Sequence, residues 1–223
     1  MELQRTEDWF AQRAGRITAS RIADVLAFSA SGVYLSGKKK GQPKEVRPLK
    51  ARVDYIHQLA AERITGRAKN QVRADALEWG KEWEPIARSR YEEERGVLVR
   101  EVGFALHPRF DFIGASADFL IGLDGGGEIK CPKDQEVHLA TLQCGLPSEH
   151  IEQIQGGLWV TGRAWWDFVS FHPYFPGTKS LYVQRIERDE DYISQMEAGC
   201  LSLQIEVEAI VNKYFEDEQE LPL

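Results

Sequence analysis

The sequence predicts an α/β fold in which a central mixed β-sheet is flanked by helices. Apolar side chains recur at helical spacing through the first 95 residues, and short apolar runs separated by turn residues follow up to residue 132. From residue 150 the order is helix, strand, strand and helix. The 223 residues, of which 43% are hydrophobic, suffice for a core, and we expect one domain over residues 1–223.

The N-terminal part predicts three helices with local start and stop signals. Thr6 precedes two acids and begins a short helix that Gly15 ends, and Thr18 begins a second helix. Apolar residues at helical spacing predict a third helix over residues 51–64, with Gly66 as its cap.

A fourth helix is predicted to begin at Asp75 and to end at Gly96. Pro85 lies inside it, and proline lacks the main-chain N–H and clashes with the preceding turn. We therefore predict a kink or a restart at Pro85.

The middle of the chain changes to the period of β-strands. Three apolar runs are separated by the turn residues His-Pro-Arg and Asp-Gly-Gly-Gly, and they cover residues 97–106, 110–123 and 126–132. The C-terminal part predicts a helix over residues 150–162, strands over 164–171 and 180–188, and a long helix over 189–215.

Charge is unevenly distributed along the chain, whose formal net charge is −7. Residues 29–50 are rich in Ser, Gly, Lys and Pro, and predict a long, mobile loop. Basic residues here and acids at the C-terminus suit a protein that holds a polyanion on one face. Four basic residues are expected to contact DNA phosphates and to steepen the salt dependence of binding: Lys38, Lys39, Lys40 and Arg47. The alternative is a solvated loop.

No apolar run is long enough to span a bilayer, and the first ten residues lack the layout of a signal peptide. The three cysteines, Cys131, Cys144 and Cys200, lack the spacing of a disulfide framework or a zinc site. These features predict a cytoplasmic protein without a membrane partner.

Three charged side chains interrupt the apolar strands between residues 116 and 132. Side chains alternate along a strand, so Glu128 and Lys130 share one face. Asp118 joins that face only if the two strands pair even positions with even, because a slip of one residue would turn it away. Burial of three such groups is costly unless they pair with one another or hold a metal.

A hard divalent cation such as Mg²⁺ would reduce this cost. Mg²⁺ prefers carboxylate and carbonyl oxygens and keeps several waters, so Asp118, Glu128 and the main-chain carbonyl of Ile129 are candidate ligands. A bound metal lowers the pKa of a water and neutralises charge on a phosphate, and Lys130 could orient the nucleophile or stabilise the transition state. The alternative is an exposed ion pair of Glu128 with Lys130, with Asp118 in a turn.

Five segments occur in order along nearly the whole chain: QRAGRITASRIADVL, ALEWGKEWEPIAR, SADFLIGLDGGGEIKCP, EQIQGGLWVTG and RIERDEDYI. Together they resemble the PD-(D/E)xK nuclease superfamily, and within it the phage lambda exonuclease and YqaJ-type viral recombinase branch. The resemblance implies a restriction-endonuclease-like core. Ala117 stands where the namesake motif has proline, and Asp118, which carries the chemistry, is present.

The resemblance implies roles for individual residues. Metal would be bound by Asp118, Glu128 and Glu84, the last at a second ion, and Lys130 would be the catalytic lysine. Gln155, the second glutamine of the Q-x-Q segment, would position the attacking water or the scissile phosphate. The alternatives are an exposed acid at Glu84 and a helix-surface glutamine at Gln155.

The resemblance also implies a pocket for a terminal 5′-phosphate. Arg13 would bind the phosphate, with Ser20 and Ser116 as hydroxyl donors, and an arginine fork with hydroxyls suits a dianion. Arg16 is a rival for Arg13, because both lie in one short segment. Leu77 would be an apolar wedge between the DNA strands, and core packing is its alternative.

The function that the resemblance implies is a 5′→3′ double-strand DNA exonuclease. It would use one or two Mg²⁺ ions, for which Mn²⁺ would substitute, and would leave 3′ overhangs for recombination. A ring-shaped homotrimer and a single-strand annealing protein as partner are also implied. The alternatives are a structure-specific or restriction-type endonuclease with the same metal core, and a catalytically inactive module that binds DNA ends.

Overall fold

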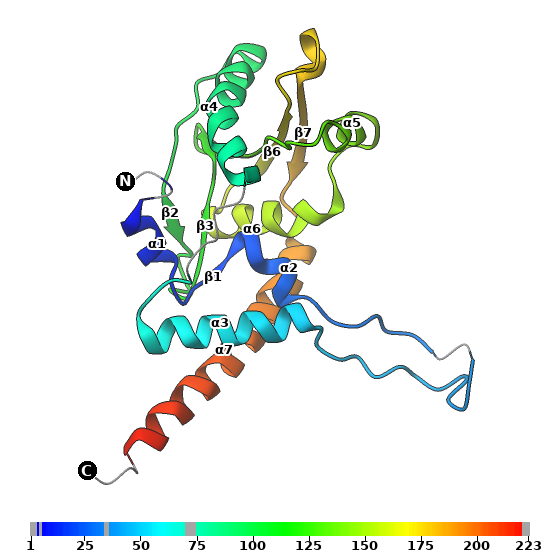
Figure 1. The fold of residues 1–223 in the computed structure, drawn as a ribbon, viewed down its shortest axis with the longest axis vertical. Helices are drawn as coiled ribbons and strands as arrows, with labels where there is room; N and C mark the ends of the chain where they lie inside the picture. Colours follow the sequence, from blue (N-terminus) through cyan, green and yellow to red (C-terminus); the bar gives the residue numbers. More distant parts are fainter. Residues whose placement is uncertain (1–3, 5, 34–35, 70–74, 220–223) are drawn as a thin grey trace.

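The computed structural model describes Gln4 and residues 6–33, 36–69 and 75–219, and of residues 75–77 and 217–219 it describes the main chain alone. Within these residues the chain forms two mixed β-sheets flanked by helices (Figure 1). The predicted α/β class is confirmed, and the predicted central sheet is divided into two.

The smaller sheet has the strand order β1-β3-β2. Strand β1 is parallel to β3, and β2 is antiparallel to it. Its strands are β1 (Ile17–Thr18), β2 (Phe104–Leu106) and β3 (Ile113–Ser116). Strand β1 lies between the first two helices, where the sequence pattern predicts no strand.

The larger sheet has the strand order β4-β5-β6-β7, in which β5 and β6 are parallel and the other neighbours antiparallel. Its strands are β4 (Phe119–Ile121), β5 (Gly125–Lys130), β6 (Trp165–Phe171) and β7 (Leu181–Glu187). The predicted strand over residues 110–123 is therefore wrong as a single strand. It is divided into β3 and β4, which belong to different sheets.

The three glycines at positions 125 to 127 lie inside strand β5, whereas the sequence predicts them in a turn. The chain turns instead at Gly122, whose φ of 50° suits glycine. A Cβ atom at Gly127 would lie 1.9 Å from the Cζ atom of Phe119, so the missing side chain lets the aromatic ring lie directly on the strand.

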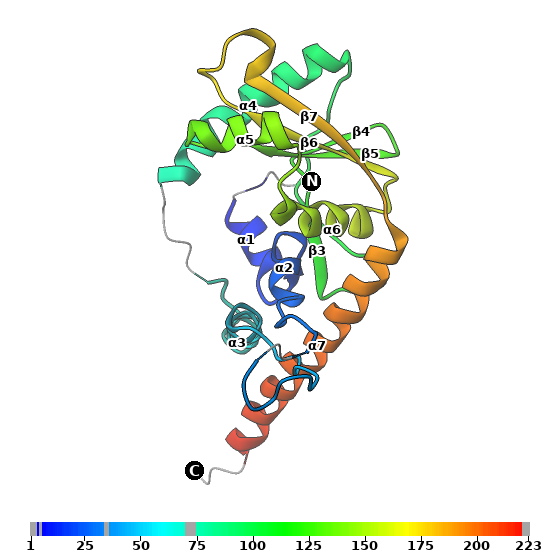
Figure 2. The ribbon, with the colours of Figure 1, turned by 90° about the vertical axis from the view of Figure 1, so that its right-hand side faces the viewer.

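Helices cover both faces of the larger sheet (Figure 2). On one face, Ala87 and Tyr91 of α4 (Asp75–Arg95) pack against apolar side chains of the sheet such as Val169. On the other face, α6 (Ile151–Thr161) packs against Trp166 and Phe168. Because side chains alternate along a strand, the odd positions of β6 face α4 and its even positions face α6.

Helix α4 is continuous through Pro85, so the predicted restart does not occur. The turns on both sides of the proline belong to one helix, which buries Ala87 and Tyr91 on the sheet after it. Packing of this face compensates for the local cost of proline.

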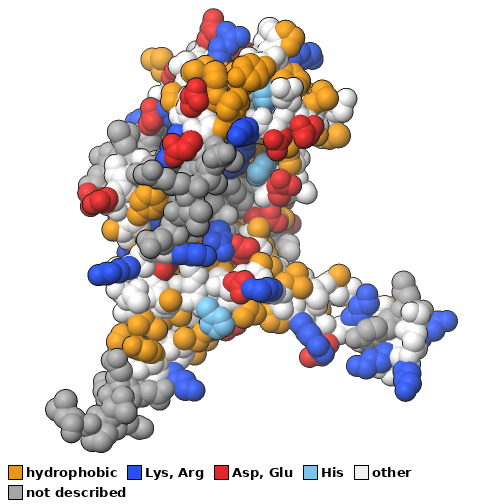
Figure 3. Space-filling model, in the orientation of Figure 1, with side chains coloured by type: hydrophobic (Ala, Val, Ile, Leu, Met, Phe, Trp, Pro, Cys, Tyr) orange, Lys and Arg blue, Asp and Glu red, His pale blue; other side chains and the backbone are white. Residues whose placement is uncertain are grey.

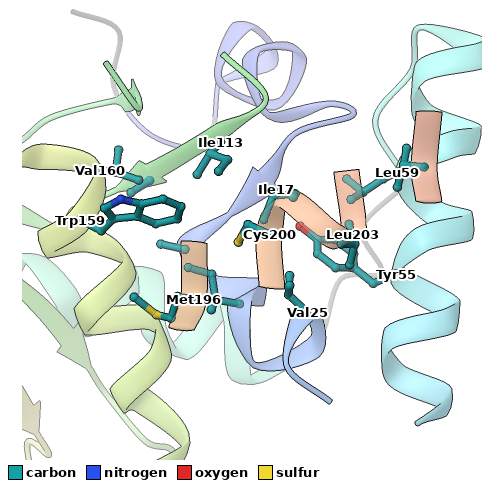
Figure 4. Packing of buried hydrophobic residues seen from close by; sticks show 14 of the residues in the cluster. Ile17, Val25, Tyr55, Leu59, Ile113, Trp159, Val160, Met196, Cys200 and Leu203 are labelled. Atoms are coloured by element: carbon teal, nitrogen blue, oxygen red, sulfur yellow. The ribbon is translucent and has the colours of Figure 1, made fainter. Parts of the chain in front are cut away.

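The smaller sheet and the remaining long helices form a second core (Figure 4). Helix α3 (Lys50–Thr65) ends at Gly66 in the left-handed conformation, as predicted. Helix α7 (Glu190–Gln219) crosses α3 and extends beyond it (Figure 1). Buried residues of both helices meet β1, β3 and α6, among them Tyr55, Leu59, Met196 and Leu203.

The N-terminal elements follow their local signals. Helix α1 (Glu7–Arg13) begins where the hydroxyl of Thr6 accepts a hydrogen bond from the Trp9 N–H, which confirms the predicted cap. After β1 come the 3₁₀ turn η1 (Ala19–Arg21) and the short helix α2 (Ile22–Val25). Three further elements complete the fold: α5 (Gln135–Cys144), for which the sequence analysis makes no prediction, and the 3₁₀ turns η2 (Ser148–His150) and η3 (Gly177–Ser180).

The segment between α2 and α3 is an extended arm that leaves the body of the molecule (Figure 1). Isolated bridges join Phe28 to Pro48 and Val33 to Pro43 across it. Lysine and arginine side chains gather at its end (Figure 3), and the four predicted DNA contacts are all exposed: Lys38, Lys39, Lys40 and Arg47. Their contact with DNA remains a prediction.

Across the described ranges, the helices are too short or too polar to cross a lipid bilayer.

We predict that Gly127→Ala destabilises the protein by about 1–3 kcal/mol, because the new methyl group overlaps the Phe119 ring and displaces it from β5. Gly80→Ala is the matched control. Gly80 lies in α4 with open space around its Cα, so the same change is expected to stabilise the helix by about 0.5–1 kcal/mol. Urea unfolding of both variants measures these changes, and a Gly127→Ala variant as stable as wild type would contradict the described packing.

Candidate functional site

A cavity of about 370 Å³ lies where the two sheets meet. Its walls come from α1, η1, α4, α6 and strands of both sheets. The lining residues are Gln4, Trp9, Phe10, Arg13, Ala19, Ser20, Lys81, Ser116, Asp118, Glu128, Lys130 and Gln153. Six of the site residues that the sequence predicts therefore share one cavity: Arg13, Ser20, Ser116, Asp118, Glu128 and Lys130.

The register of β4 and β5 brings the charged residues together. Phe119 pairs with Gly127 and Leu120 with Gly126, which is the even-with-even pairing that places Asp118 across from Glu128. Their side chains, with that of Lys130, lie on the sheet face that α6 covers. The alternative, with Asp118 turned away, does not occur.

Asp118 lies at the passage from β3 to β4, between Ser116 at the end of one sheet and Phe119 at the start of the other. Its Oδ2 atom accepts a hydrogen bond of 2.7 Å from the Ile129 N–H. Desolvation raises the pKa of Asp118 well above its ordinary value, and the negative charges of Glu128 and Glu84 raise it further. The buried site thus disfavours a negative charge on Asp118.

Lys130 and Gln153 hold the carboxylate of Glu128. The Lys130 Nζ donates to Glu128 Oε1 at 2.7 Å and to Gln153 Oε1 at 3.2 Å, and Gln153 Nε2 donates to Glu128 Oε1 at 2.6 Å. Burial lowers the pKa of Lys130, but Glu128 and Asp118 outweigh burial and raise it overall. Lys130 is therefore a fixed ammonium beside two carboxylates.

Glu84 lies next to Asp118 in an adjoining cavity of about 190 Å³. Asp118 lines both cavities, whereas Glu84 lines only the smaller one. Arg88 donates to Glu84 Oε1 at 3.0 Å and also pairs with Glu101. The structure thus brings Glu84 to the site, in a cavity that it shares with Asp118.

The chemistry of the donors fits a cation that keeps most of its waters. In the described part of the chain no three His, Cys, Asp or Glu side chains form a group that could hold a metal ion. Two carboxylates face the cavity, those of Asp118 and Glu128, and the Ile129 carbonyl is on the same strand. Mg²⁺ commonly binds through one or two carboxylates and substrate oxygens, so these residues suit it better than a metal that needs a full set of protein ligands.

The predicted role of Gln155 requires a correction. Its Nε2 donates to the Glu187 carbonyl at 2.9 Å, and its Oε1 accepts from the Asp189 N–H at 3.0 Å. Buried between α6 and β7, Gln155 is absent from the cavity wall, and Gln153 is there instead. Residues two apart on a helix point to different faces, so the Q-x-Q spacing allows only one of the two to face the acids. The spacing alone does not tell which of the two it is.

The predicted phosphate pocket is assembled around Arg13. Its guanidinium donates to Ser116 Oγ at 3.3 Å and to Ser20 Oγ at 3.4 Å. Trp9, the tryptophan whose place near Arg13 in the sequence makes it the best candidate of its type to contact DNA, donates from its indole N–H to Ser116 Oγ at 2.9 Å, and the centre of its ring lies 4.2 Å from the guanidinium carbon. Burial lowers the pKa of Arg13, so an anion in the cavity would replace the solvation that the guanidinium has lost.

The structure does not place Arg16 in this pocket. Arg16 donates to the main-chain carbonyls of Asp111 at 2.9 Å and Gln12 at 2.6 Å, and it lines a different cavity. Helix α1 ends at Arg13, and the turn that follows directs Arg16 elsewhere. Leu77, the predicted wedge, has a side chain that lies outside the described residues.

Lys81 is a cation of the cavity that sequence analysis missed. It lines the cavity of Asp118 and also that of Glu84, and its Nζ donates to Glu78 Oε1 at 2.8 Å. Positions 77, 81 and 84 repeat at helical spacing, so they share one face of a helix. Because the resemblance implies site residues at 77 and 84, this spacing could have identified Lys81.

Comparisons with known proteins agree with this geometry. The model of the YqaJ-like viral recombinase domain matches residues 8–164. LHK-Exo, an alkaline exonuclease from Laribacter hongkongensis, is 36% identical, with 97% of this chain and 100% of that chain covered and a TM-score of 0.82. Its structure in complex with dAMP gives the same identity and coverage with a TM-score of 0.83.

A phage-related exonuclease from Haemophilus somnus 129PT shares the fold at 16% identity, with 89% of this chain and 96% of that chain covered and a TM-score of 0.63. The search of curated proteins finds no match. The family model spans well over half of the chain, and LHK-Exo matches almost all of it. The protein therefore belongs to the YqaJ-like viral recombinase family.

Proposed function

We propose that the protein is a Mg²⁺-dependent exonuclease that degrades the 5′-ended strand of duplex DNA and leaves 3′ overhangs. One observation carries the proposal: the acids Asp118 and Glu128, the ammonium of Lys130 and the Arg13 pocket line a single cavity. A centre for phosphodiester hydrolysis and a binding site for a terminal phosphate would then lie within reach of one nucleotide.

The pocket explains the choice of a DNA end. Arg13 carries a full positive charge and two neighbouring hydroxyls, which suit the dianionic phosphate at a 5′ end better than the monoanionic phosphodiester inside a strand. With that phosphate at Arg13, the next phosphodiester lies toward Asp118 and Glu128. Cleavage there removes one nucleotide and gives 5′→3′ polarity.

Asp118, Glu128 and the Ile129 carbonyl would hold the metal. Mg²⁺ at these oxygens would supply a water of lowered pKa and positive charge beside the phosphate. The Lys130 ammonium stabilises negative charge that grows on the phosphate oxygens, because Glu128 and Gln153 hold it in place before the substrate binds. Gln153 also fixes the orientation of Glu128, and Lys81 is placed to contact the strand that enters.

The relatives support the substrate class. LHK-Exo is an alkaline exonuclease and binds dAMP, a 5′-mononucleotide of the kind that this reaction would release. The homotrimeric ring and the single-strand annealing partner are proposals that the resemblance implies. Analytical ultracentrifugation and co-purification with an annealing protein would check them.

A structure-specific or restriction-type endonuclease is the second candidate, because the same acids and lysine serve it equally. The Arg13 pocket favours the exonuclease, since an enzyme that cuts inside a strand has no terminal phosphate to bind. A catalytically inactive end-binding module is disfavoured, because Asp118, Glu128 and Lys130 are all present and oriented into the cavity.

Wild-type protein with Mg²⁺ is expected to digest linear duplex from its 5′ ends and to leave a covalently closed circle intact. Glu128→Ala should reduce digestion at least about 100-fold and retain binding of DNA ends. End-labelled substrates and a gel-shift assay measure the two effects, with Glu94→Ala, an exposed acid on α4, as control. Cutting of the circle would favour the endonuclease, and undiminished digestion by Glu128→Ala would refute the site.

Arg13→Ala is expected to slow digestion of 5′-phosphorylated ends about 10- to 100-fold, the loss that corresponds to hydrogen bonds with a charged group. Digestion of 5′-hydroxyl ends should change much less, because they lack the dianion. Arg90→Ala, which removes a surface arginine paired with Glu93, is the matched control. Equal slowing of both kinds of end would place the phosphate pocket elsewhere.

The two glutamines of α6 should behave differently. Gln153→Ala is expected to lower kcat about 10- to 100-fold with little change in Tm, since it orients Glu128 and Lys130. Gln155→Ala should lower the free energy of unfolding by about 1–3 kcal/mol, because it leaves buried main-chain groups unpaired, with a much smaller effect on kcat. Single-turnover rates and urea unfolding separate these outcomes, and the reverse pattern would contradict the placement of the two side chains.

A further inference from the structure

A second cavity, of about 480 Å³, adjoins the catalytic cavity. The two share Phe10, Arg13 and Ser20 as a common wall. The other walls of the second cavity come from α3, β1, η1 and the segment after α3. We propose that this cavity binds the nucleoside 5′-monophosphate that hydrolysis releases. The inference rests on the proposed function, because such a product arises only if the chain cleaves DNA.

The charge of the cavity favours an anion. Its lining includes four cationic side chains, those of Arg13, Arg16, Arg21 and Lys69, and one acid, Glu62. Arg21 is already paired with Asp24, so the charge that favours an anion comes from the other three. The contacts of Arg13 go to hydroxyl oxygens and those of Arg16 to main-chain carbonyls, which are neutral acceptors that leave the positive charges uncompensated. A phosphate dianion supplies the missing negative charge.

Glu62 offsets only part of this charge: burial lowers the pKa of Arg13, and the negative charge of Glu62 is among those that raise it. Its carboxylate accepts hydrogen bonds from the Gly15 N–H at 2.7 Å, Gln58 Nε2 at 2.9 Å and the Lys69 N–H at 3.0 Å. These three donors hold the acid against the protein main chain and reduce its effect on a ligand. The contact of Lys69 is made by its main chain, so its side-chain ammonium is not needed to hold Glu62.

The remaining walls suit a nucleoside rather than phosphate alone. The volume lies in the range of small-molecule sites, about 300–1,000 Å³. Phe10 lies on the shared wall and offers an aromatic ring to a base, and Gln58 offers amide groups to its polar edge. Gln58 is held by Glu62 and by Arg21, whose guanidinium carbon lies 4.4 Å from the ring centre of Tyr55.

The position of the cavity has a consequence for the reaction. Water adds to phosphorus, the P–O3′ bond breaks, and the first nucleotide leaves with its 5′-phosphate and a new 3′-hydroxyl while the shortened strand keeps the other phosphate. The freed phosphate is still at Arg13, and the shortened strand now carries a 5′-phosphate that needs the same arginine. Transfer of the mononucleotide across Arg13 into the second cavity vacates the pocket for the next phosphate.

The test is calorimetric binding of dAMP to the full chain in EDTA, where no cleavage can occur. Arg16→Ala and Lys69→Ala should each weaken binding about fivefold or more, since each removes a charge that lines only the second cavity. Arg90→Ala is the matched control, because this surface arginine pairs with Glu93 and lines neither cavity, and it should leave the affinity within about twofold. Inorganic phosphate and deoxyadenosine should both bind more weakly than dAMP.

Unchanged dAMP affinity in both Arg16→Ala and Lys69→Ala would place the nucleotide outside the second cavity and overturn the proposal. Equal affinity for inorganic phosphate and dAMP would overturn the nucleoside site. Lys69 is exposed, so its variant remains informative if Arg16→Ala fails to fold. Digestion of linear duplex by the same wild-type sample tests the proposed function separately. If the sample does not digest DNA, the proposed nuclease function is refuted. If it digests DNA and both variants bind dAMP as tightly as wild type, only the second site is refuted.

Discussion

The hydrogen bond from the Ile129 N–H to the Asp118 carboxylate connects the fold to its chemistry. It extends the pairing of β4 with β5 to the point where the chain passes from one sheet to the other. The Ile129 N–H is paired there with the Asp118 side chain instead of with a main-chain carbonyl. The same carboxylate lines the cavity, and Ser116, two residues earlier, reaches it from the other sheet. Asp118 thus lies between the end of β3 and the start of β4 and supplies an acid, so the site cannot be separated from the junction of the sheets.

The parts of the fold that the sequence predicts are those with local causes. Thr6 caps α1 through its own hydroxyl and Gly66 ends α3 in the left-handed conformation, and both follow from neighbouring residues. The glycines of β5 are different, because glycine in a short segment favours a turn. Aromatic rings on the two neighbouring strands explain them: Trp165 lies against Gly125, Trp166 against Gly126 and Phe119 against Gly127. The division of residues 110–123 likewise depends on partners distant in sequence, since β3 pairs with β1 and β2 whereas β4 pairs with β5.

The site could be predicted to the extent that strand alternation and motif order determine it. Alternation placed Glu128 and Lys130 together, and the even register completed the group with Asp118. The choice between neighbouring residues of one type could not be made in this way. Arg13 ends α1 whereas Arg16 follows the turn, and Gln153 and Gln155 lie on different faces of α6, so the backbone direction at each position decides which one reaches the cavity.

The charges around Arg13 also explain how a chain of net charge −7 can hold a polyanion. Phosphates and the carboxylates of Asp118 and Glu128 repel each other. Burial, together with the charges of Glu128 and Glu84, raises the pKa of Asp118 although Lys130 lies beside it. A strand is therefore favoured in this cavity only together with further positive charge, which the metal would add at the acids and Arg13 adds at the other end. Because Arg13 also faces the second cavity, its charge favours phosphate on both sides, and a phosphate can pass between the two without leaving a cationic surface.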